Sequence, residues 1–580
     1  MLKRYPHLYI FMKDNKKSLN ILWLSVLCSV VYVCFSLQIP TLFGSVLDQI
    51  TENGSQEELL RLLSKILYLA VFSGIWQYLS IYLSNQQSYR LSFNLRNKAF
   101  NHLQELPLSY LDNRPTGKTL DIIISDINII TDGMQIAVSQ LIIGAATILG
   151  TTISMLILNP TASIVVFVLT PLSLLLTKFL AKNTHNYFVE QSNSRATQTA
   201  FVEEMLSNEN LIKSCLRENI TIEEFKEHND SFVNSSEKAT FFSSLTNPST
   251  RLLNNIIYSI IALIGAIVCI KKGSIFSIGQ FSALLTFSNQ FGKPFNDISS
   301  VITELQNCFN SIENVYSFLE VETESESSDK IDLFEADGNV SLDDINFSYN
   351  PGTKLIQNFN LSIEKGNHVA LVGPTGCGKT TIINLLMRFY DSYSGNIIVD
   401  DVNSILLTRK ALRKNFGMVL QDTWIKTASV RDNLAFAKPN ASLEEVIKIA
   451  KITKADDFIQ KLPLGYDTII GDEGVALSEG QLQLLCITRL FLTMPPIILL
   501  DEATSSVDTK TERDIYRSLD ELLEGRTSFI VAHRLSTIES ADIIVVMDSG
   551  QIVEKGNHKS LMDKKGFYYN LYQSQYSTIS

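Results

Sequence analysis

Gly373-Pro374-Thr375-Gly376-Cys377-Gly378-Lys379-Thr380 fits the pattern G-x-x-x-x-G-K-[ST] at every fixed position. Apolar residues 369–372 precede this stretch, and a helical pattern over residues 381–389 follows it. Glycines let the backbone approach phosphate oxygens, and the amide groups at the start of the helix supply positive potential. The alternative is a glycine-rich turn that merely joins a strand to a helix, and the context argues against it. The stretch therefore predicts a nucleoside triphosphate site in an α/β domain.

The predicted phosphate loop assigns roles to its residues. Lys379 would reach the β and γ phosphates, and the Thr380 hydroxyl would ligate Mg²⁺. The other residues of the loop, together with Thr381 at the start of the helix, would surround the phosphates with backbone amide groups. We therefore expect a nucleotide and Mg²⁺ as ligands.

The composition separates two halves of the chain, which at 580 residues is too long for a single core. Long apolar runs crowd the first 300 residues and then vanish, which predicts a membrane half followed by a soluble half. The net charge of −11 and the lack of a basic patch argue against nucleic acid as a partner. The seven cysteines are scattered without a C-x-x-C pair, which is typical of a reducing cytoplasm.

About six apolar stretches are long enough to cross about 30 Å of hydrocarbon. They cover residues 19–43, 62–83, 136–158, 162–180, 252–270 and 278–301. The first has too long an apolar core for a cleavable signal peptide and lacks an A-x-A-like site, so we expect it to stay in the membrane. The sequence thus predicts an all-α transmembrane domain of about six helices over residues 1–315.

The charges that flank the spans predict their orientation. Basic residues precede the first span, whereas acidic residues follow it between positions 48 and 58. By the positive-inside bias the N-terminus is cytoplasmic, and an even number of crossings returns the chain to the cytoplasm. Lys271 and Lys272 contradict the rule between the fifth and sixth spans, but that connection is very short.

Two connections, over residues 84–134 and 182–251, are too long for turns and have helical periodicity. We expect the spans to continue into the cytoplasm there. Such extensions are either structural stalks or contacts to the soluble domain, and an attached nucleotide-binding domain favours contact.

The sixth span is unusually polar. Its polar residues are Gln280, Ser288, Asn289, Gln290, Lys293, Asn296 and Asp297. Polar groups at membrane depth are costly unless they face water or a partner, so they often mark a translocation path. The alternative is that the later ones lie beyond the bilayer.

A linker rich in Glu, Ser and Asp, within residues 316–336, leads to a soluble domain over residues 337–580. There the alternation of strands and helices predicts an α/β core. Residues 497–500 form a buried parallel strand that ends in Asp501 and Glu502, about 120 residues after the phosphate loop. Asp501 would support Mg²⁺, and Glu502 would polarise the attacking water.

Several motifs follow one another in a fixed order. They are Tyr349, Gly373 to Thr380, Gln421, Leu477-Ser478-Glu479-Gly480-Gln481, Asp501-Glu502, Ser505-Ser506-Val507-Asp508 and His533. This order resembles the nucleotide-binding domain of ABC transporters from about residue 340 to the C-terminus. With about six spans before it, the whole chain resembles a type I ABC exporter half-transporter, with an all-α membrane domain and an α/β P-loop NTPase domain.

The resemblance implies a role for each motif. Tyr349 would stack on the adenine of ATP, the alternative being a packed strand aromatic. Gln421 would approach Mg²⁺ and the attacking water. His533 would contact the γ phosphate and hold Glu502 and the water in line, the alternative being an ordinary core histidine. Gly471-Asp472-Glu473-Gly474 resembles the exporter loop that touches the intracellular helices.

The resemblance also implies a second subunit. Ser478, Gly480 and Gln481 would present a hydroxyl and backbone amides to ATP held by the opposite chain, with Asp508 near the join. Glu479 stands where the family has glycine, and its Cβ and charge would weaken that site if the side chain points inward. An outward side chain would make the substitution tolerable.

Leu482 stands where an arginine is usual, and the residues Gln483-Leu484-Leu485-Cys486-Ile487-Thr488-Arg489 follow it. The region is similar to the catalytically complete subunit of bacterial heterodimeric multidrug exporters. This similarity favours a heterodimer over a homodimer.

The sequence thus predicts an ATP-hydrolysing exporter subunit in the cytoplasmic membrane of a bacterium, with both termini in the cytoplasm. Its substrate would be hydrophobic or amphipathic, such as a drug, lipid or peptide. A homodimeric lipid or drug flippase and an exporter-fold importer of metal chelates are the alternatives. A peptide exporter with an N-terminal protease domain is disfavoured, because no protease domain precedes the first span. A regulatory ATPase or a gated channel is a further alternative, and stimulation of ATP hydrolysis by drugs or lipids would argue against it.

Overall fold

The computed structural model describes residues 6–270, 277–324, 329–350, 352–419, 423–471, 473–501, 509–532 and 535–576. Within some helices, among them residues 169–185 and 295–300, it describes the backbone alone. The chain divides into two compact units. The first comprises Met1–Gln104 and Pro115–Val321, and the second comprises Glu105–Arg114 and Glu322–Ser580.

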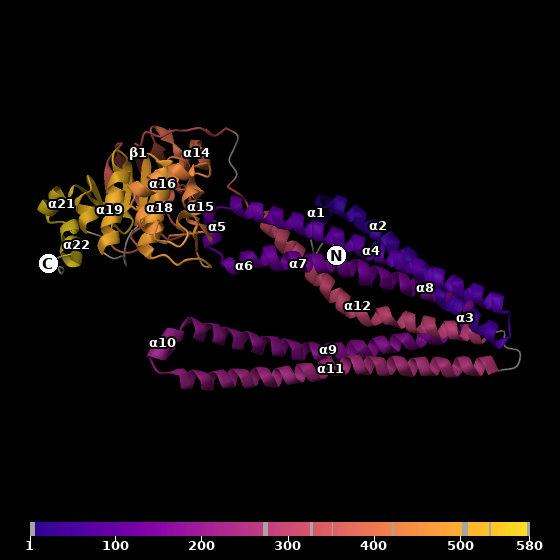
Figure 1. Cartoon of the computed structure of the whole chain (residues 1–580). Helices are drawn as coiled ribbons and strands as arrows, with labels where there is room; N and C mark the ends of the chain where they lie inside the picture. The colour runs from indigo at the N-terminus through magenta and orange to yellow at the C-terminus, as the bar shows by residue number, and fades with distance from the viewer. Residues whose placement is uncertain are drawn as a thin grey trace. The chain divides into compact units, whose positions relative to one another are not determined.

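The regular secondary structure described in the first unit is all helical (Figure 1). Its helices are α1 (His7–Asp14), α2 (Lys16–Ser36), α3 (Gln38–Thr51), α4 (Gln56–Glu105), α6 (Thr116–Asp121), α7 (Ile127–Ile136), α8 (Ile143–Leu158), α9 (Pro160–Ser207), α10 (Glu209–Ser214), α11 (Glu218–Ile270) and α12 (Ile278–Leu319). Two π-helical turns, Ile122–Asp126 and Ala137–Ile142, flank α7.

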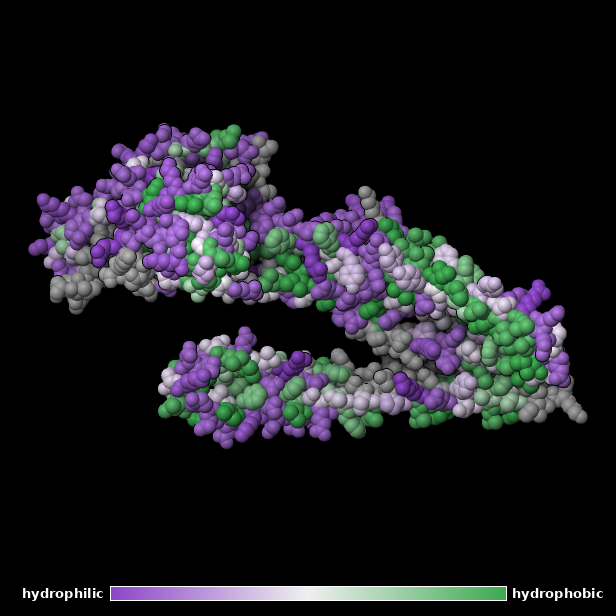
Figure 2. Space-filling model, viewed as in Figure 1, coloured by the Kyte–Doolittle hydropathy of each residue, from purple (hydrophilic) through white to green (hydrophobic). Residues whose placement is uncertain are grey.

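Apolar residues mark the parts of these helices that suit a bilayer. Among the described residues, Asn20–Thr51, Gln56–Glu105 and Thr116–Leu158 are long and apolar enough to span it, and Asn255–Ile267 in α11 is a shorter apolar segment. Figure 2 shows hydrophobic side chains gathered along α2, α3 and α4, whereas the second unit has a largely hydrophilic surface. The first unit is therefore a helical transmembrane domain.

Three helices are much longer than a membrane is thick. The 50 residues of α4, the 48 of α9 and the 53 of α11 correspond to about 70 to 80 Å of helix at about 1.5 Å per residue, against about 30 Å of hydrocarbon. The expected extensions of the spans are therefore continuous helix. Figure 1 shows α9 and α11 side by side, joined by α10.

Helices α3 and α12 meet through two glycines. A Cβ on Gly279 would lie 2.0 Å from the carbonyl oxygen of Gly44, so only a residue without a side chain allows this approach. The carboxylate of Asp48 then accepts hydrogen bonds from the backbone N–H of Gly279 at 2.7 Å and from the hydroxyl of Ser277 at 2.7 Å. We call Gly44, Asp48, Ser277 and Gly279 the glycine clasp.

The polar residues of the sixth predicted span have several different roles. The backbone N–H of Gln280 donates to the Ser277 hydroxyl at 3.0 Å, and the Gln280 side chain accepts from the Ser277 N–H at 3.3 Å, so Gln280 caps the start of α12. Asn289 and Lys293 are exposed, whereas Gln290 lines a pocket. The side chains at positions 296 and 297 lie outside the described residues. The Gln280 side chain thus has a capping role that the sequence analysis did not predict.

The second unit has an α/β core. Its strands are β1 (Val340–Phe347), β2 (Ile356–Ile363), β3 (His368–Val372), β4 (Ser394–Val399), β5 (Val402–Asn403), β6 (Phe416–Val419), β7 (Ala428–Ser429), β8 (Ile469–Ile470), β9 (Ile497–Asp501), β10 (Thr527–Val531), β11 (Ile543–Asp548) and β12 (Gln551–Gly556). Its helices are α5 (Leu108–Asp112), α13 (Lys379–Leu386), α14 (Arg409–Arg413), α15 (Val430–Leu434), α16 (Leu443–Ile452), α17 (Asp456–Ile459), α18 (Glu479–Thr493), α19 (Thr509–Leu523), α20 (Leu535–Glu539), α21 (His558–Lys564) and α22 (Phe567–Tyr576).

The strands form one mixed six-stranded sheet in the order β12-β11-β3-β10-β9-β6 and one antiparallel sheet in the order β2-β1-β4-β5. In the six-stranded sheet only β12 runs antiparallel to its neighbour. A core that includes Phe359, Leu371 and Ile383 joins both sheets to α13. The carboxyl ends of β3, β10, β9 and β6 consequently meet at one edge, where ligands of parallel sheets bind.

Ten residues between α4 and α6 belong to the second unit. The Tyr390 hydroxyl donates to the carboxylate of Asp112 at the end of α5, and the N–H of Glu324 donates to the carbonyl of Glu105 at 2.8 Å. Burial, and then the Asp112 carboxylate, raise the pKa of Tyr390 above its ordinary value. The helix α12 continues to Leu319, so the first part of the expected linker is helical.

Candidate nucleotide site

The phosphate loop joins β3 to α13 as the sequence predicts, but α13 covers Lys379–Leu386, two or three residues ahead of the expected range. Gly378 forms the N-cap of this helix with φ of +102°, a conformation that glycine adopts readily. A Cβ at this position would lie 2.5 Å from Cδ1 of Ile356. Gly378 is therefore needed both for the backbone conformation and for the packing of β2 under the loop.

Lys379 is 7% exposed and its ammonium group is directed into the loop. Its Nζ donates hydrogen bonds to the carbonyl oxygens of Gly373 at 2.8 Å and Pro374 at 3.0 Å. This arrangement places a positive charge inside a ring of backbone groups, where a phosphate would be bound. Burial raises the pKa of the adjacent Cys377 thiol, so this cysteine stays protonated near neutral pH.

Asp501 lies at the carboxyl end of β9, beside the start of α13. Because β3 and β9 both pair with β10 in parallel, their ends are brought to the same edge. The Thr380 hydroxyl donates to Oδ1 of Asp501 at 3.3 Å, and Asp501 is 9% exposed. A hydroxyl and a carboxylate are ligands that suit Mg²⁺, which completes its shell with water and phosphate oxygens. These two residues fit the predicted magnesium site.

Tyr349 lies beside the first turns of α13. Its hydroxyl donates to the Thr381 hydroxyl at 3.3 Å and accepts from the Asn384 amide at 3.1 Å. The rings of Phe347 and Tyr390 meet it edge to face, at centroid distances of 5.0 and 4.9 Å. The side chain is 40% exposed, so part of this ring remains accessible for stacking.

The sequence around Ser478 forms the start of α18. The Ser478 hydroxyl accepts from the N–H of Gln481 at 3.4 Å, and the Gln481 side chain accepts from the N–H of Ser478 at 2.9 Å. Ser478 and Glu479 are exposed, whereas Gly480 is buried. The exposed Glu479 side chain has room for either of the two orientations that the sequence leaves open.

Arg489 is a positioning residue whose contacts the sequence motifs do not reveal. From the third turn of α18 its guanidinium donates to the Asn433 carbonyl at 2.7 Å, to the Asn433 side-chain oxygen at 3.0 Å and to the Trp424 carbonyl at 2.9 Å. These bonds attach α18 to the segment that follows Gln421. A long-range side-chain pair of this kind has no sequence signature, although a charged residue in a helix otherwise packed with apolar residues is a weak signal.

Five of the predicted residues lie outside the described residues. They are Gln421, Asp472, Glu502, Asp508 and His533. The described strands β6, β9 and β10 nevertheless end one or two residues before Gln421, Glu502 and His533, respectively.

Comparisons of this chain with known protein families agree with the geometry of the phosphate loop and Asp501. A family model for the ABC transporter transmembrane region matches residues 22–295, and one for the ABC transporter domain matches residues 356–505. A fatty acid ABC transporter ATP-binding/permease protein of Mycobacterium bovis is 36% identical over 509 residues, which cover 88% of this chain and 80% of that protein. The chain belongs to the ABC transporter family.

Other relatives are similar to this half-transporter over nearly its full length. An uncharacterized ABC transporter ATP-binding protein of Bacillus subtilis, YfiC, is 34% identical over 97% of this chain and 95% of its own. An ATP-dependent lipid A-core flippase of Syntrophus aciditrophicus is 30% identical over 95% of this chain and 92% of its own. The solved structure of a bacterial Atm1-family ABC exporter with ATP bound has a TM-score of 0.77 at 23% identity, and the match covers 97% of this chain and 99% of that chain.

This half-transporter therefore has the ABC exporter fold, a helical transmembrane domain followed by a nucleotide-binding domain with a mixed sheet. It hydrolyses ATP to drive transport, as members of its family do.

Proposed function

We propose that this half-transporter closes with a second half-transporter over two ATP molecules and thereby exports an amphipathic substrate across the cytoplasmic membrane of a bacterium. The observation that carries the proposal is the buried Lys379 in a complete phosphate loop beside Asp501, on a chain whose other unit is helical and apolar. The excess of basic residues ahead of the first span favours a cytoplasmic location for both termini.

Two exposed regions support the need for a second chain. Ser478 and Glu479 at the start of α18 are exposed, and a helix start of this kind binds anions. The connection around α10 exposes apolar side chains, with Leu211 within the helix 61% exposed and Leu216 just after it 83% exposed. Leucines this exposed in a connection far from the apolar helix segments suit a contact with the nucleotide-binding domain of a partner.

Each nucleotide in this proposal is held by residues of both chains. Lys379 binds the β and γ phosphates, Tyr349 stacks on adenine, and Ser478 of one chain donates to the ATP of the other. Thr380, Asp501 and Gln421 would hold Mg²⁺, which would supply positive charge against the phosphates when bound. Glu502 accepts a proton from the attacking water, and His533 holds both in line.

The irregular signature supports a heterodimer. Glu479 adds a negative charge at the helix start that would face the phosphates of the other chain, so that site binds ATP more weakly than one with glycine. A partner chain with a regular signature and a weaker catalytic set would complement this one. The pair would then have one strongly and one weakly hydrolysing site.

Replacing Glu502 with Gln tests the catalytic assignment. The variant should lose steady ATP hydrolysis by about a hundredfold or more and keep ATP binding, because the amide cannot accept a proton. Lys379→Ala, by contrast, should lose binding as well. Normal turnover in the Gln variant would contradict the role of Glu502.

Purification of the chain alone and with its native partner tests the heterodimer. We expect little ATPase activity from the single chain and a large increase on reconstitution with the partner. Full activity of the single chain, together with a symmetric dimer in solution, would favour the homodimeric flippase instead.

An importer of metal chelates with the exporter fold is the second candidate, because it would use the same ATP site. Transport in inside-out vesicles separates the two directions. ATP-dependent accumulation inside these vesicles supports export, and ATP-dependent loss of a preloaded substrate would support import.

A further inference from the structure

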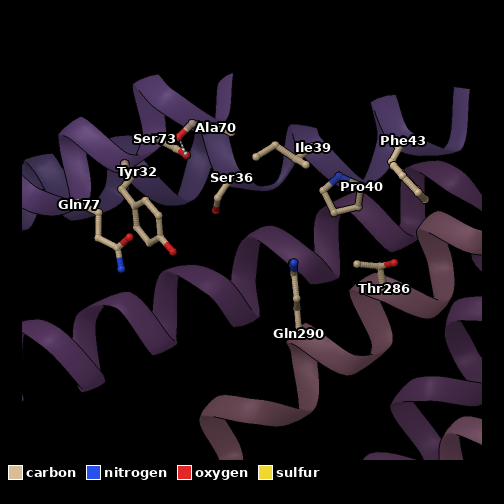
Figure 3. A pocket seen from close by; sticks show the side chains of 11 residues that line it. Tyr32, Ser36, Ile39, Pro40, Phe43, Ala70, Ser73, Gln77, Thr286 and Gln290 are labelled. Carbon is tan, nitrogen blue, oxygen red and sulfur yellow. Dashed lines mark hydrogen bonds between the residues drawn. The ribbon is translucent and has the colours of Figure 1, made fainter. Parts of the chain in front are cut away.

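A pocket lies inside the transmembrane unit, between α2, α3, α4 and α12, and has a volume of about 400 Å³. This volume lies within the range of sites that hold small molecules. Figure 3 shows its lining side chains, with Tyr32 and Gln77 near each other and Gln290 extending from α12 toward the helices that carry Ser36 and Pro40. Gln290 follows the start of α12 by twelve residues, or about 18 Å of helix, which places the pocket at membrane depth.

Three polar side chains of this pocket have no partner among the described residues. In that part of the chain, neither the Tyr32 hydroxyl nor the amides of Gln77 and Gln290 make a side-chain hydrogen bond. All three are half-buried. A hydrogen-bonding group without a partner is costly in an apolar environment, so these groups require water or a polar ligand. The three residues come from three different helices, α2, α4 and α12, that line one pocket.

The rest of the lining is apolar or weakly polar. Ile39, Pro40 and Phe43 form an apolar wall, and Thr286 adds a hydroxyl. Among the described lining residues none is acidic, basic or histidine. A charged head group would therefore be desolvated there without an ion-pair partner, which costs far more than burial of a neutral head group.

We propose that this pocket binds uncharged amphipathic molecules. A head group that carries hydroxyls or amides bonds to Tyr32, Gln77 and Gln290, and a hydrocarbon tail lies along Ile39 and Phe43. Uncharged amphipathic molecules would then be the substrate class of this transporter, an inference that rests on the transport function proposed above. A pocket of this kind would not favour ionised carboxylates, although one relative is named a fatty acid transporter.

Equilibrium binding to the purified full chain in lipid nanodiscs, without ATP, tests the proposal. Radiolabelled monolauroylglycerol, laurate and dodecyltrimethylammonium carry tails of similar length on neutral, negative and positive head groups. We expect laurate and dodecyltrimethylammonium to bind about tenfold more weakly than monolauroylglycerol, because their charges are unpaired in the pocket. Equal or tighter binding of laurate would overturn the proposal.

Variants locate the binding. Gln290→Leu and Tyr32→Phe should each weaken monolauroylglycerol binding about three- to tenfold, the value of one hydrogen bond. The matched control is Asn289→Leu, since Asn289 is the exposed neighbour on the same helix and does not line the pocket. An equal loss in the control would place the ligand elsewhere. Folding should survive, because leucine removes a polar group at membrane depth.

A gain of function completes the test. Gln290→Lys should shift the preference toward laurate by providing a cation, and an unchanged preference would count against the site. Because binding is measured without ATP or a partner, it is independent of hydrolysis. Selective binding without any ATP-driven movement of monolauroylglycerol would leave the pocket assignment intact and contradict the transport proposal.

Discussion

Ser277-Ile278-Gly279-Gln280 and Ser478-Glu479-Gly480-Gln481 are two helix starts with the same pattern and different surroundings. In both, a serine hydroxyl and a glutamine side chain form a reciprocal cap. At α12 the N–H of Gly279 donates to Asp48 of α3, and the glycine clasp closes the start of the helix inside the chain. At α18 the first turn has no such partner in the described ranges, and the first residue of the helix is the exposed Glu479.

A capping pattern therefore fixes where a helix begins but not what its free N–H groups bind. At α12 they are used for packing between helices. At α18 they remain available for an anion from another molecule. Substitutions at equivalent positions of the two starts should consequently differ in their effects on stability and activity.

The largest effect should come from Gly279→Ala. Its Cβ would overlap the backbone oxygen of Gly44, which cannot move away as a flexible side chain would, so we expect a loss of about 3 kcal/mol of stability or more. Thermal unfolding in detergent measures this loss. Gly292→Ala is the control on the same helix, because no atom lies within 4 Å of a Cβ added at this position. We expect this variant to be more stable than the original chain by about 0.5 to 1 kcal/mol. Equal behaviour of the two variants would disprove the clasp.

The paired variants Ser277→Ala and Ser478→Ala come next. Ser478→Ala removes a cap and should cost about 1 kcal/mol of stability. Ser277→Ala should cost about 2 to 4 kcal/mol, because it also removes the hydrogen bond to the Asp48 carboxylate. In the assembled transporter Ser478→Ala should also lower the ATPase rate about tenfold or more, because it removes a hydrogen bond to a charged phosphate. ATPase assays and unfolding midpoints measured together separate the two effects. An equally strong loss of hydrolysis in Ser277→Ala would show that the two helix starts do not differ in this way.

Glu479→Gln should have a smaller effect. The substitution keeps the size of the side chain and removes its charge, so we expect ATP binding by the closed pair to tighten about two- to fivefold. Rising salt should reduce this gain, because the interaction is exposed to solvent. Nucleotide titrations at low and high ionic strength measure it. Unchanged affinity at low salt would show that the carboxylate points away from the phosphates in the closed form as well.

The smallest effect concerns the opposite end of α12. The imidazole of His7 contacts Glu313 through Nδ1 at 2.5 Å and Glu320 through Nε2 at 3.0 Å. Burial lowers the pKa of His7, but the hydrogen bonds and charges of Glu320 and Glu313 outweigh it and raise the pKa overall. A raised pKa stabilises the folded contact at low pH, and this contribution is lost as pH rises through the folded pKa.

Hydrogen exchange of α1 should therefore become faster as the pH rises from about 6 to about 8, after correction for the intrinsic exchange rate. Nearby Asp14 pairs with Lys98 at 3.4 Å. His7→Gln should remove the pH dependence. Its persistence in that variant would assign the effect to another group.

The nucleotide-binding half could be predicted well because its chemistry is concentrated in short motifs. Lys379 and Thr380 lie seven and eight residues along one loop, and the parallel sheet then brings Asp501 to Thr380 as expected. The membrane half could be predicted only in outline. Apolar length predicts helices, yet the contact between Gly44 and Gly279 joins residues that no local pattern relates.

Polar residues in the sixth span show why the side-chain roles in the membrane half could not be predicted from the sequence. Gln280 and Gln290 look equivalent in the sequence, but one caps α12 and the other faces a pocket. Which role applies depends on the neighbouring helix, and that is set by packing of distant segments. The same holds for Arg489, whose partner Asn433 lies 56 residues earlier.

The ten residues from Glu105 to Arg114 mean that the soluble half is not a contiguous module. A fragment of residues 337–580 would omit α5 and leave Tyr390 without its bond to Asp112. Exchange of soluble domains between relatives consequently requires this short insert to be exchanged as well. Recombination at a single crossover point would produce mismatched surfaces, so the two halves of such a transporter are expected to be inherited together.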